Sequence, residues 1–157
     1  MKPEAHVCAV VLRRAQAGDA AAVTACVCAA YLPYIERIGR QPGPMLEDYA
    51  ALIARMHLHV AENDGRIVGV LVLEVDAAGV FVDNVAVHPA AQGGGIGRRL
   101  LELAEREARA RGYASITLST NDKMVENQAL YARIGYVPFE RRIVNGYARV
   151  FMRKVLA

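Results

Sequence analysis

Cysteine is scarce in this sequence, and long apolar runs are missing. The three cysteines are Cys8, Cys26 and Cys28. An odd number without a secretory signal excludes a complete disulfide framework. The first residues, Met1 to His6, lack the apolar core of a signal peptide. No apolar run is expected to reach the roughly 20 residues that span a bilayer. We therefore expect a cytoplasmic protein with no membrane partner.

A large excess of charge of either sign is also missing. Nineteen lysines and arginines face 16 aspartates and glutamates, which gives a formal net charge of +3. Arginines between positions 98 and 111 are interspersed with acids, so a solvated surface is expected and a nucleic-acid partner is not. His57 and His59 could share one face of a strand, but they have no clear third ligand, so no metal is expected.

The composition is that of a globular chain, with 54% hydrophobic and 22% charged residues among 157. We expect one domain over residues 1–157. Apolar periodicity and turn residues predict an alternation of strands and helices. The predicted strands are Cys8–Arg13, His57–Glu62, Arg66–Val75, Val80–Val87, Tyr113–Thr120, Tyr136–Val144 and Tyr147–Val155; the predicted helices are Ala20–Leu32, Met45–Met56, Gly95–Arg111 and Met124–Ile134.

Turn residues fix how these elements connect. Asn63-Asp64-Gly65 and Asn145-Gly146 are typical of hairpins, and Pro33 is expected to end or kink the first helix. The strand at 113–120 returns after a long helix, which predicts one parallel βαβ pair. The fold class is therefore α+β: a mostly antiparallel central sheet with one parallel pair and helices on both faces.

One stretch, Gln92 to Arg98, joins the strand at 80–87 to the longest predicted helix. Its four glycines remove Cβ atoms from a turn that presents the free N–H groups of a helix start, which suits phosphate oxygens. Arg98 and Arg99 lie where the helix dipole disfavours cations, and a bound polyanion would explain them, as would simple solvation. The stretch has neither the lysine of a P-loop nor the third glycine of a dinucleotide-binding fingerprint.

This loop, written Gln-x-x-Gly-x-Gly after a strand ending Val-Ala-Val-His-Pro, resembles the acetyl-CoA pyrophosphate loop of the GNAT superfamily of acyl-CoA-dependent N-acyltransferases. The predicted element order is similar over nearly the whole chain. The resemblance implies a GNAT-like fold, acetyl-CoA as cofactor, and an N-acetyltransferase in which a primary amine, of a small molecule or a peptide, attacks the thioester directly in a ternary complex. It assigns cofactor binding to the backbone of Val85, Ala86 and Val87, beside a splay from 116–119, and to Gln92, Gly93, Gly94, Gly95, Ile96, Gly97 and Arg98.

A second segment, Asn127 to Pro138, is similar to the family segment Asn…Leu-Tyr…Gly-Phe/Tyr. The resemblance makes Tyr131 the general acid for the leaving thiolate. A phenol has a pKa of about 10 and a thiol of about 8.5, close enough for proton transfer or a hydrogen bond. Many family members place the asparagine seven residues before the tyrosine, where this chain has Met124. Either Asn127 or Asn121 is therefore expected to contact the cofactor.

The general base and the acceptor are less defined by the sequence. Asp83, on the strand before the loop, is the first candidate for the base, with Asp122, Glu126 or a water chain as alternatives. An irregular stretch between the first two helices suggests a substrate-binding wall. Its candidate residues are Tyr31, Tyr34, Arg37, Arg40 and Met45.

The wall leaves the acceptor open. Aromatic rings would receive an amine by cation–π contact, and arginines would hold a carboxylate or a phosphate. Two alternatives to an enzyme are a non-catalytic acyl-CoA sensor or scaffold of the same fold, and an unrelated anion-binding regulator. A homodimer through an exposed final strand is a further hypothesis.

Overall fold

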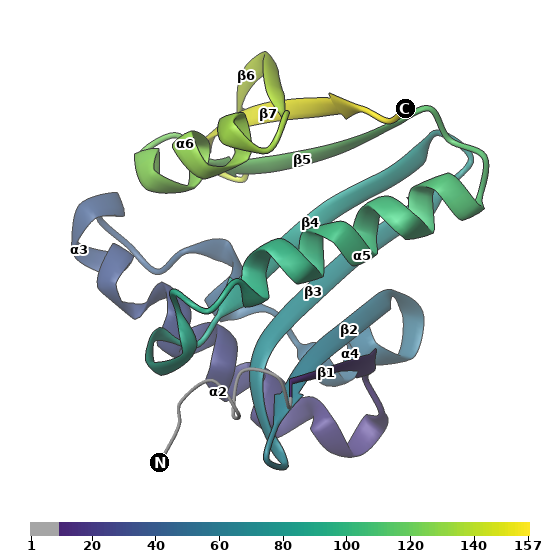
Figure 1. The fold of residues 1–157 in the computed structure, drawn as a ribbon. Helices are drawn as coiled ribbons and strands as arrows, with labels where there is room; N and C mark the ends of the chain where they lie inside the picture. Colours follow the sequence, from purple (N-terminus) through teal and green to yellow (C-terminus); the bar gives the residue numbers. More distant parts are fainter. Residues whose placement is uncertain (1–9) are drawn as a thin grey trace.

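A seven-stranded sheet crosses the computed structural model, which describes residues 10–157 (Figure 1). Its strand order is β1-β2-β3-β4-β5-β7-β6. Every neighbouring pair is antiparallel except β4 and β5, which confirms the predicted α+β class. The strands are β1 (Val11–Arg14), β2 (His57–Asn63), β3 (Arg66–Asp76), β4 (Gly79–Val87), β5 (Ser115–Asn121), β6 (Val137–Val144) and β7 (Tyr147–Val155). Cys8 and Ala9, in the first predicted strand, lie outside the described residues.

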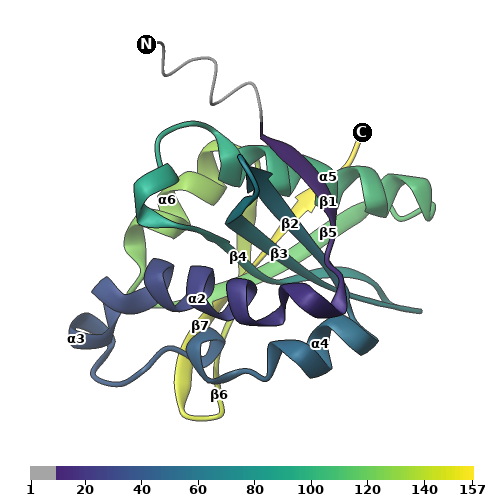
Figure 2. The same cartoon turned by 90° about the horizontal axis from the view of Figure 1, so that it is seen from below.

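The helices cover both faces of this sheet (Figure 2). They are α2 (Ala20–Tyr31), α3 (Ile35–Ile38), α4 (Tyr49–Arg55), α5 (Ile96–Ala110) and α6 (Val125–Arg133), with 3-10 turns η1 (Ala17–Asp19), η2 (Leu32–Tyr34), η3 (Gly43–Leu46) and η4 (Pro89–Ala91). On one face, Leu100, Leu101 and Ala104 of α5 are buried with Tyr131 of α6 in the larger core. On the other, Val23 and Val27 of α2 and Leu52 of α4 form a second core.

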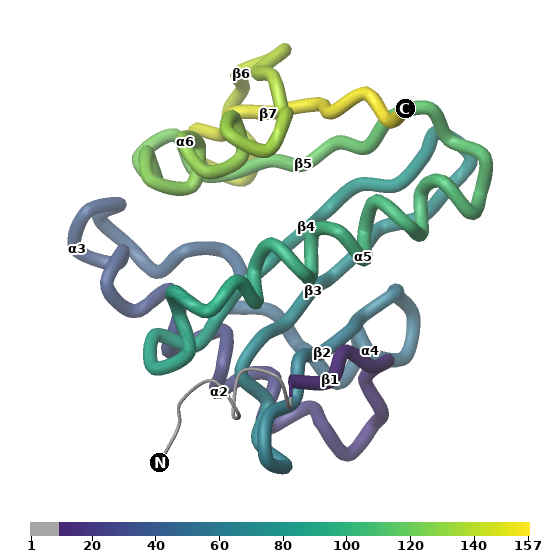
Figure 3. Tube along the Cα trace, in the orientation of Figure 1, coloured from purple at the N-terminus to yellow at the C-terminus, as the bar shows by residue number. Residues whose placement is uncertain are grey.

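The sheet splits between its two parallel strands. Hydrogen-bonded pairing of β4 with β5 extends only from Val80 to Val82, opposite Ile116 to Leu118. The Cα traces of the two strands then diverge (Figure 3). The split therefore opens beyond Leu118, whereas the sequence led us to expect it along 116–119. The backbone of β4 after Val82 has no strand neighbour on its β5 side among the described strands.

A β-bulge lies in β4 next to the split. Val82 pairs with Leu73 and Asn84 with Val72, so Asp83 is an extra residue in the ladder. Val82 belongs to the core under α5, but Ala86 belongs to the core under α2. A bulge shifts the alternation of side chains by one residue. Asp83 and Asn84 consequently line the same clefts.

Several predicted boundaries need correction. The helix expected over 45–56 is a 3-10 turn, η3, followed by the shorter α4, because Asp48 caps a new helix by accepting a hydrogen bond from the Ala51 N–H at 3.2 Å. The first helix ends next to Pro33 as predicted: α2 stops at Tyr31, and Pro33 occupies the first turn of η2, where its missing N–H leaves no hydrogen bond unmade. The final strand β7 is not exposed at an edge, because it lies between β5 and β6. A homodimer through that strand is therefore not supported.

The expectation that no apolar run reaches membrane-span length also needs correction. The helical run from Ala17 to Ile38 has 22 residues, and an 18-residue window within it has a mean hydropathy of 1.3, so by length and composition alone this run could cross a membrane. Within this run, α2 buries Val23, Cys26 and Val27 against the sheet. The predicted cytoplasmic location stays a prediction.

Candidate active site

The glycine-rich loop follows directly from the end of β4. The Gln92 side-chain amide donates to the Val87 carbonyl at 3.1 Å, which fastens the loop to the strand. Gly95 adopts φ +82° at the N-cap of α5, a left-handed conformation that favours glycine. The backbone N–H groups from Gly93 to Arg98 have no acceptor within residues 10–157. The loop therefore presents a row of free donors at the positive end of a 15-residue helix.

The two arginines at the helix start are held by different partners. Arg98 lies 3.6 Å from the Glu102 carboxylate, and both side chains are more than half exposed. Arg99 donates to the Val10 carbonyl at 3.3 Å. Arg98 alone stands beside the loop and lines the cleft described next. Its pairing with Glu102 offsets part of the unfavourable interaction with the helix dipole.

One cleft of about 650 Å³ brings together most residues of the two sequence segments. From the predicted cofactor set, its lining contains Val85, Val87, Gln92, Gly93, Gly95, Ile96, Gly97, Arg98 and Asn127; it also contains Tyr34 and Tyr131. Gly94 instead lines a separate hollow with His88 and Ile67. The side chain of Ala86 is buried in the core under α2, so only its backbone is available to a ligand. We call this the loop cleft.

Tyr131 lies where the loop cleft meets a small pocket at the split of the sheet. Its ring is 6% exposed and packs edge-on against Tyr136, with ring centroids 6.1 Å apart. Its hydroxyl has no hydrogen-bond partner among the described residues. Burial, and then the nearby Tyr136, raise the pKa of Tyr131 well above its usual value. The phenol thus stays protonated at neutral pH and can donate a hydrogen bond into the pocket.

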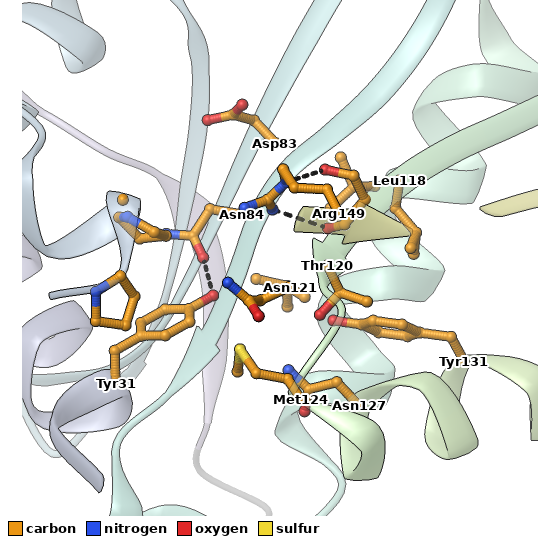
Figure 4. Close-up of a pocket in the computed structure, with 16 residues that line it drawn as sticks. Tyr31, Asp83, Asn84, Leu118, Thr120, Asn121, Met124, Asn127, Tyr131 and Arg149 are labelled. Atoms are coloured by element: carbon orange, nitrogen blue, oxygen red, sulfur yellow. Dashed lines mark hydrogen bonds between the residues drawn. The ribbon is translucent and has the colours of Figure 1, made fainter. Parts of the chain in front are cut away.

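Asn84 forms a buried polar chain on the far side of this pocket (Figure 4). The Tyr31 hydroxyl donates to the Asn84 side-chain oxygen at 2.7 Å, and the Asn84 amide donates to the Tyr49 hydroxyl at 3.3 Å. Tyr49 in turn donates to the Pro44 carbonyl at 2.6 Å. Burial raises the pKa of both tyrosines. This chain fastens α2 and the η3 segment to the strand that bears Asp83.

Asp83 lies on the bulge and lines both the small pocket and a larger groove. Burial is the main cause that raises its pKa, and Glu47 adds to that effect. Arg149 of β7 acts in the opposite direction on the pKa values of Asp83, Tyr31 and Tyr131. The Arg149 guanidinium donates to the Ser119 hydroxyl at 2.9 Å and to the Ser119 carbonyl at 3.4 Å. Arg149, which has no ion pair with an acidic residue within positions 10–157, thus lies among three titratable groups.

The alternative carboxylates are engaged at the surface. Glu126 pairs with Arg37 at 2.6 Å, and this hydrogen bond lowers the pKa of Glu126. Asp122 pairs with Arg141. Asp83 has no such ion pair among the described residues and is the most buried of the three.

The two asparagines differ in position. The Asn121 side chain accepts from the Lys123 N–H at 2.9 Å, which shapes the turn before α6. Asn121 lines the small pocket only, whereas Asn127 lines both that pocket and the loop cleft.

The predicted acceptor wall is only partly assembled. Tyr31 lines the small pocket, but Tyr34 lines the loop cleft instead. Arg40 lies outside the described clefts: it stacks over the Tyr147 ring at 3.7 Å and donates to the Asn145 carbonyl at 2.8 Å. Arg40 therefore joins the segment after α3 to the β6–β7 hairpin, because its long side chain reaches the hairpin turn.

A second groove, of about 640 Å³, opens on the sheet face opposite α5. We call it the strand groove. Asp83, Asn84 and Arg149 belong to it as well as to the small pocket, so the two are neighbours at the split.

The sequence analysis missed Asn84, Tyr49 and Arg149. A buried asparagine beside two tyrosines carries no local pattern, and Arg149 reaches the site only through pairing of β7 with β5.

His57 and His59 take no part in these clefts. They are two residues apart on β2 and therefore lie on one face of that strand. Burial is the main cause that lowers the pKa of both, and Arg14 adds to that effect. No group of three or more His, Cys, Asp or Glu side chains within residues 10–157 is placed to hold a metal ion.

Comparison with known proteins gives a consistent result. A family described as "Acetyltransferase (GNAT) domain" matches residues 54–138, more than half of the chain. An "IAA acetyltransferase" of Azospirillum brasilense is 40% identical over 79 residues, which cover 49% of this chain and 52% of that protein. The match thus spans about half the length of this curated relative.

Two solved structures have a similar fold. A GCN5-related N-acetyltransferase from Rhodopseudomonas palustris has a TM-score of 0.79 and 27% identity, covering 93% of this chain and 95% of that one. The PaiA N-acetyltransferase of Thermoplasma acidophilum, solved in complex with coenzyme A, has a TM-score of 0.77 and 16% identity, covering 94% and 99%. The second likeness concerns the fold alone.

Proposed function

This chain belongs to the acetyltransferase (GNAT) domain family, and from that premise we propose that it is an acetyl-CoA-dependent N-acetyltransferase whose acceptor is a primary amine. One observation carries the proposal. The free loop donors, the unpaired edge of β4 and the Tyr131 hydroxyl all face one cleft, and that cleft meets a second groove at the split of the sheet. Two reactants could therefore approach one point from opposite faces.

The loop cleft has the donors that acetyl-CoA requires. The N–H groups from Gly93 to Arg98 suit the pyrophosphate oxygens, and Arg98 adds a cation. Backbone groups of Val85 and Val87 suit the amides of the pantetheine arm, as an added strand would pair. Asn127 is the asparagine that we assign to cofactor contact, because it lines this cleft.

The reaction needs two proton movements. The amine nitrogen forms a bond to the thioester carbonyl carbon, and the carbon–sulfur bond breaks. We assign the proton that the sulfur receives to the Tyr131 hydroxyl, and the proton that the amine loses to Asp83. Charge that develops on the carbonyl oxygen can be stabilised by the free N–H groups of β4 next to the bulge. All chemistry is direct transfer, with no covalent enzyme intermediate.

We expect calorimetry to show saturable binding of acetyl-CoA to the purified chain, and a panel of primary amines to release free thiol. Each mole of thiol should accompany one mole of acetylated amine, measured by mass spectrometry. Binding of acetyl-CoA without transfer to any amine class would indicate a sensor of the same fold. Failure to bind acetyl-CoA, with or without amine present, would contradict the proposal.

The pH dependence of kcat/KM tests the base. Because the base must be ionised and the pKa of Asp83 is raised, activity should increase with pH through that raised pKa. Arg149 lowers the pKa of Asp83, so Arg149→Gln should move this acidic limb to higher pH. Asp83→Asn should remove the limb and reduce kcat/KM by about 100-fold. Unchanged limbs in both variants would exclude Asp83 as the base.

A further inference from the structure

The strand groove has an aromatic floor on the open face of β4, β7 and β6. The Phe81 and Phe151 rings are stacked, with centroids 6.3 Å apart, and Phe139 meets Phe151 edge-on at 6.5 Å. All three rings line the groove. Such a floor favours a flat apolar body over a chain of polar groups.

Charges are separated across this floor. The acids Glu47, Glu74 and Asp83 come from the η3–α4 connection, β3 and β4, on one side. The arginines come from β6 and β7, on the other side: Arg142, Arg149 and Arg153. The exception is Glu140 on β6, which pairs with Arg142 at 3.4 Å. Because β5 lies between β4 and β7, the backbones of β4 and β7 are about 10 Å apart where β4 pairs with β5.

The arginine wall is already oriented. The Arg153 guanidinium lies 4.2 Å from the centre of the Phe139 ring, and the Arg142 guanidinium lies 4.2 Å from that of Phe151. Arg153 has no acidic partner among the described residues. A guanidinium stacked on a ring keeps its N–H edge free, and that edge matches a carboxylate in two parallel hydrogen bonds. Arg153 is therefore suited to a carboxylate of the ligand.

We infer that the acceptor is an amine that carries a carboxylate at the opposite end of an aromatic body. Its amino group lies toward Asp83, its ring lies beside Phe81, and its carboxylate pairs with Arg153. Phe81 is the ring of the floor over which no guanidinium is stacked among the described residues. This inference names the substrate class of the proposed transferase and rests on that function. A polyamine or a basic peptide amine would place a second cation against the arginine wall, so neither fits the groove.

The test uses three commercial amines on the full chain. 4-(Aminomethyl)benzoate has the inferred features, 4-(aminomethyl)benzamide lacks only the negative charge, and 6-aminohexanoate lacks the ring. We measure kcat/KM by thiol release at saturating acetyl-CoA, and equilibrium binding of each amine in the presence of coenzyme A. The benzoate should exceed the benzamide by about tenfold in both measurements, because a charge-assisted pair replaces a neutral one. It should also exceed the hexanoate.

Variants of Arg153 test whether the arginine wall causes the preference for the benzoate over the benzamide. Arg153→Gln should bring the benzoate-to-benzamide ratio close to one without changing acetyl-CoA affinity, and Arg153→Lys should restore part of it. Arg106→Gln, on the exposed face of α5 and far from the groove in sequence and fold, is the matched control and should keep the ratio.

Each other outcome has a definite meaning. A benzamide used as well as the benzoate, or a ratio that survives Arg153→Gln, overturns the inference while the transferase function stands. A chain that binds no acetyl-CoA but prefers the benzoate in equilibrium binding supports the groove assignment and contradicts the transferase.

Discussion

Replacing Tyr131 with phenylalanine should lower kcat about 100-fold, the size expected for loss of one general acid. The ring belongs to the core under α5, and phenylalanine keeps that packing. The hydroxyl makes no hydrogen bond within the described residues, so its removal leaves no internal partner unsatisfied. Acetyl-CoA affinity by calorimetry and the thermal midpoint should both stay close to those of the wild type.

The neighbouring tyrosine provides the control. Tyr136 is also buried, packs against Tyr131, and has a hydroxyl with no partner among the described residues. It lines none of the three clefts at the site. Tyr136→Phe should therefore leave kcat unchanged. Equal rate losses in the two variants, or none in Tyr131→Phe, would show that the Tyr131 hydroxyl does not serve the leaving sulfur.

Replacing Gly95 with aspartate should weaken acetyl-CoA binding at least tenfold more than replacing it with asparagine. A Cβ at this position would meet no heavy atom within 4 Å, so the cost of substitution comes from the left-handed backbone. Asparagine and aspartate tolerate that conformation to a similar degree. The two variants differ by one negative charge beside the free loop donors.

Stability gives this comparison an internal check. A carboxylate at a helix N-terminus interacts favourably with the dipole, so Gly95→Asp should be at least as stable to unfolding as Gly95→Asn. Stability and affinity are thus expected to move in opposite directions. The affinity gap should also shrink as salt is raised, because the repulsion is screened. Equal affinities in low salt would place the pyrophosphate elsewhere.

The sequence was sufficient for features that are contiguous in the chain. The loop, its helix and the Asn127–Tyr131 pair each occupy a few consecutive turns, and all of these lie along one cleft. The long helix α5 was expected over 95–111 and is found over Ile96–Ala110, because its apolar residues repeat at helical spacing.

Features that depend on pairing between distant strands could not be predicted. Val82, Asn84 and Ala86 are all buried, so β4 shows the burial pattern of a strand without a bulge. That pattern does not reveal that the bulge at Asp83 moves the buried side chains from one face of the sheet to the other. Asn84 finds Tyr31 across 53 positions in the chain. The place of Arg149 depends on its register opposite Asn121, and nothing local to either strand specifies that register. The sequence placed Arg40 at the acceptor wall. Its actual contact, with the hairpin turn, is likewise non-local and could not be predicted.

The split in the sheet bears on aggregation as well as on binding. A strand edge with free backbone groups is usually a template on which other chains add strands. The unpaired edge of β4 lies inside the loop cleft, and residues of α5 and α6 line that cleft beside it. One of the two outer edges, β6, carries Pro138 and three successive charged residues from Glu140 to Arg142. At the split, the free backbone groups of β4 are thus flanked by helices, and this restricts the access of another polypeptide strand to them.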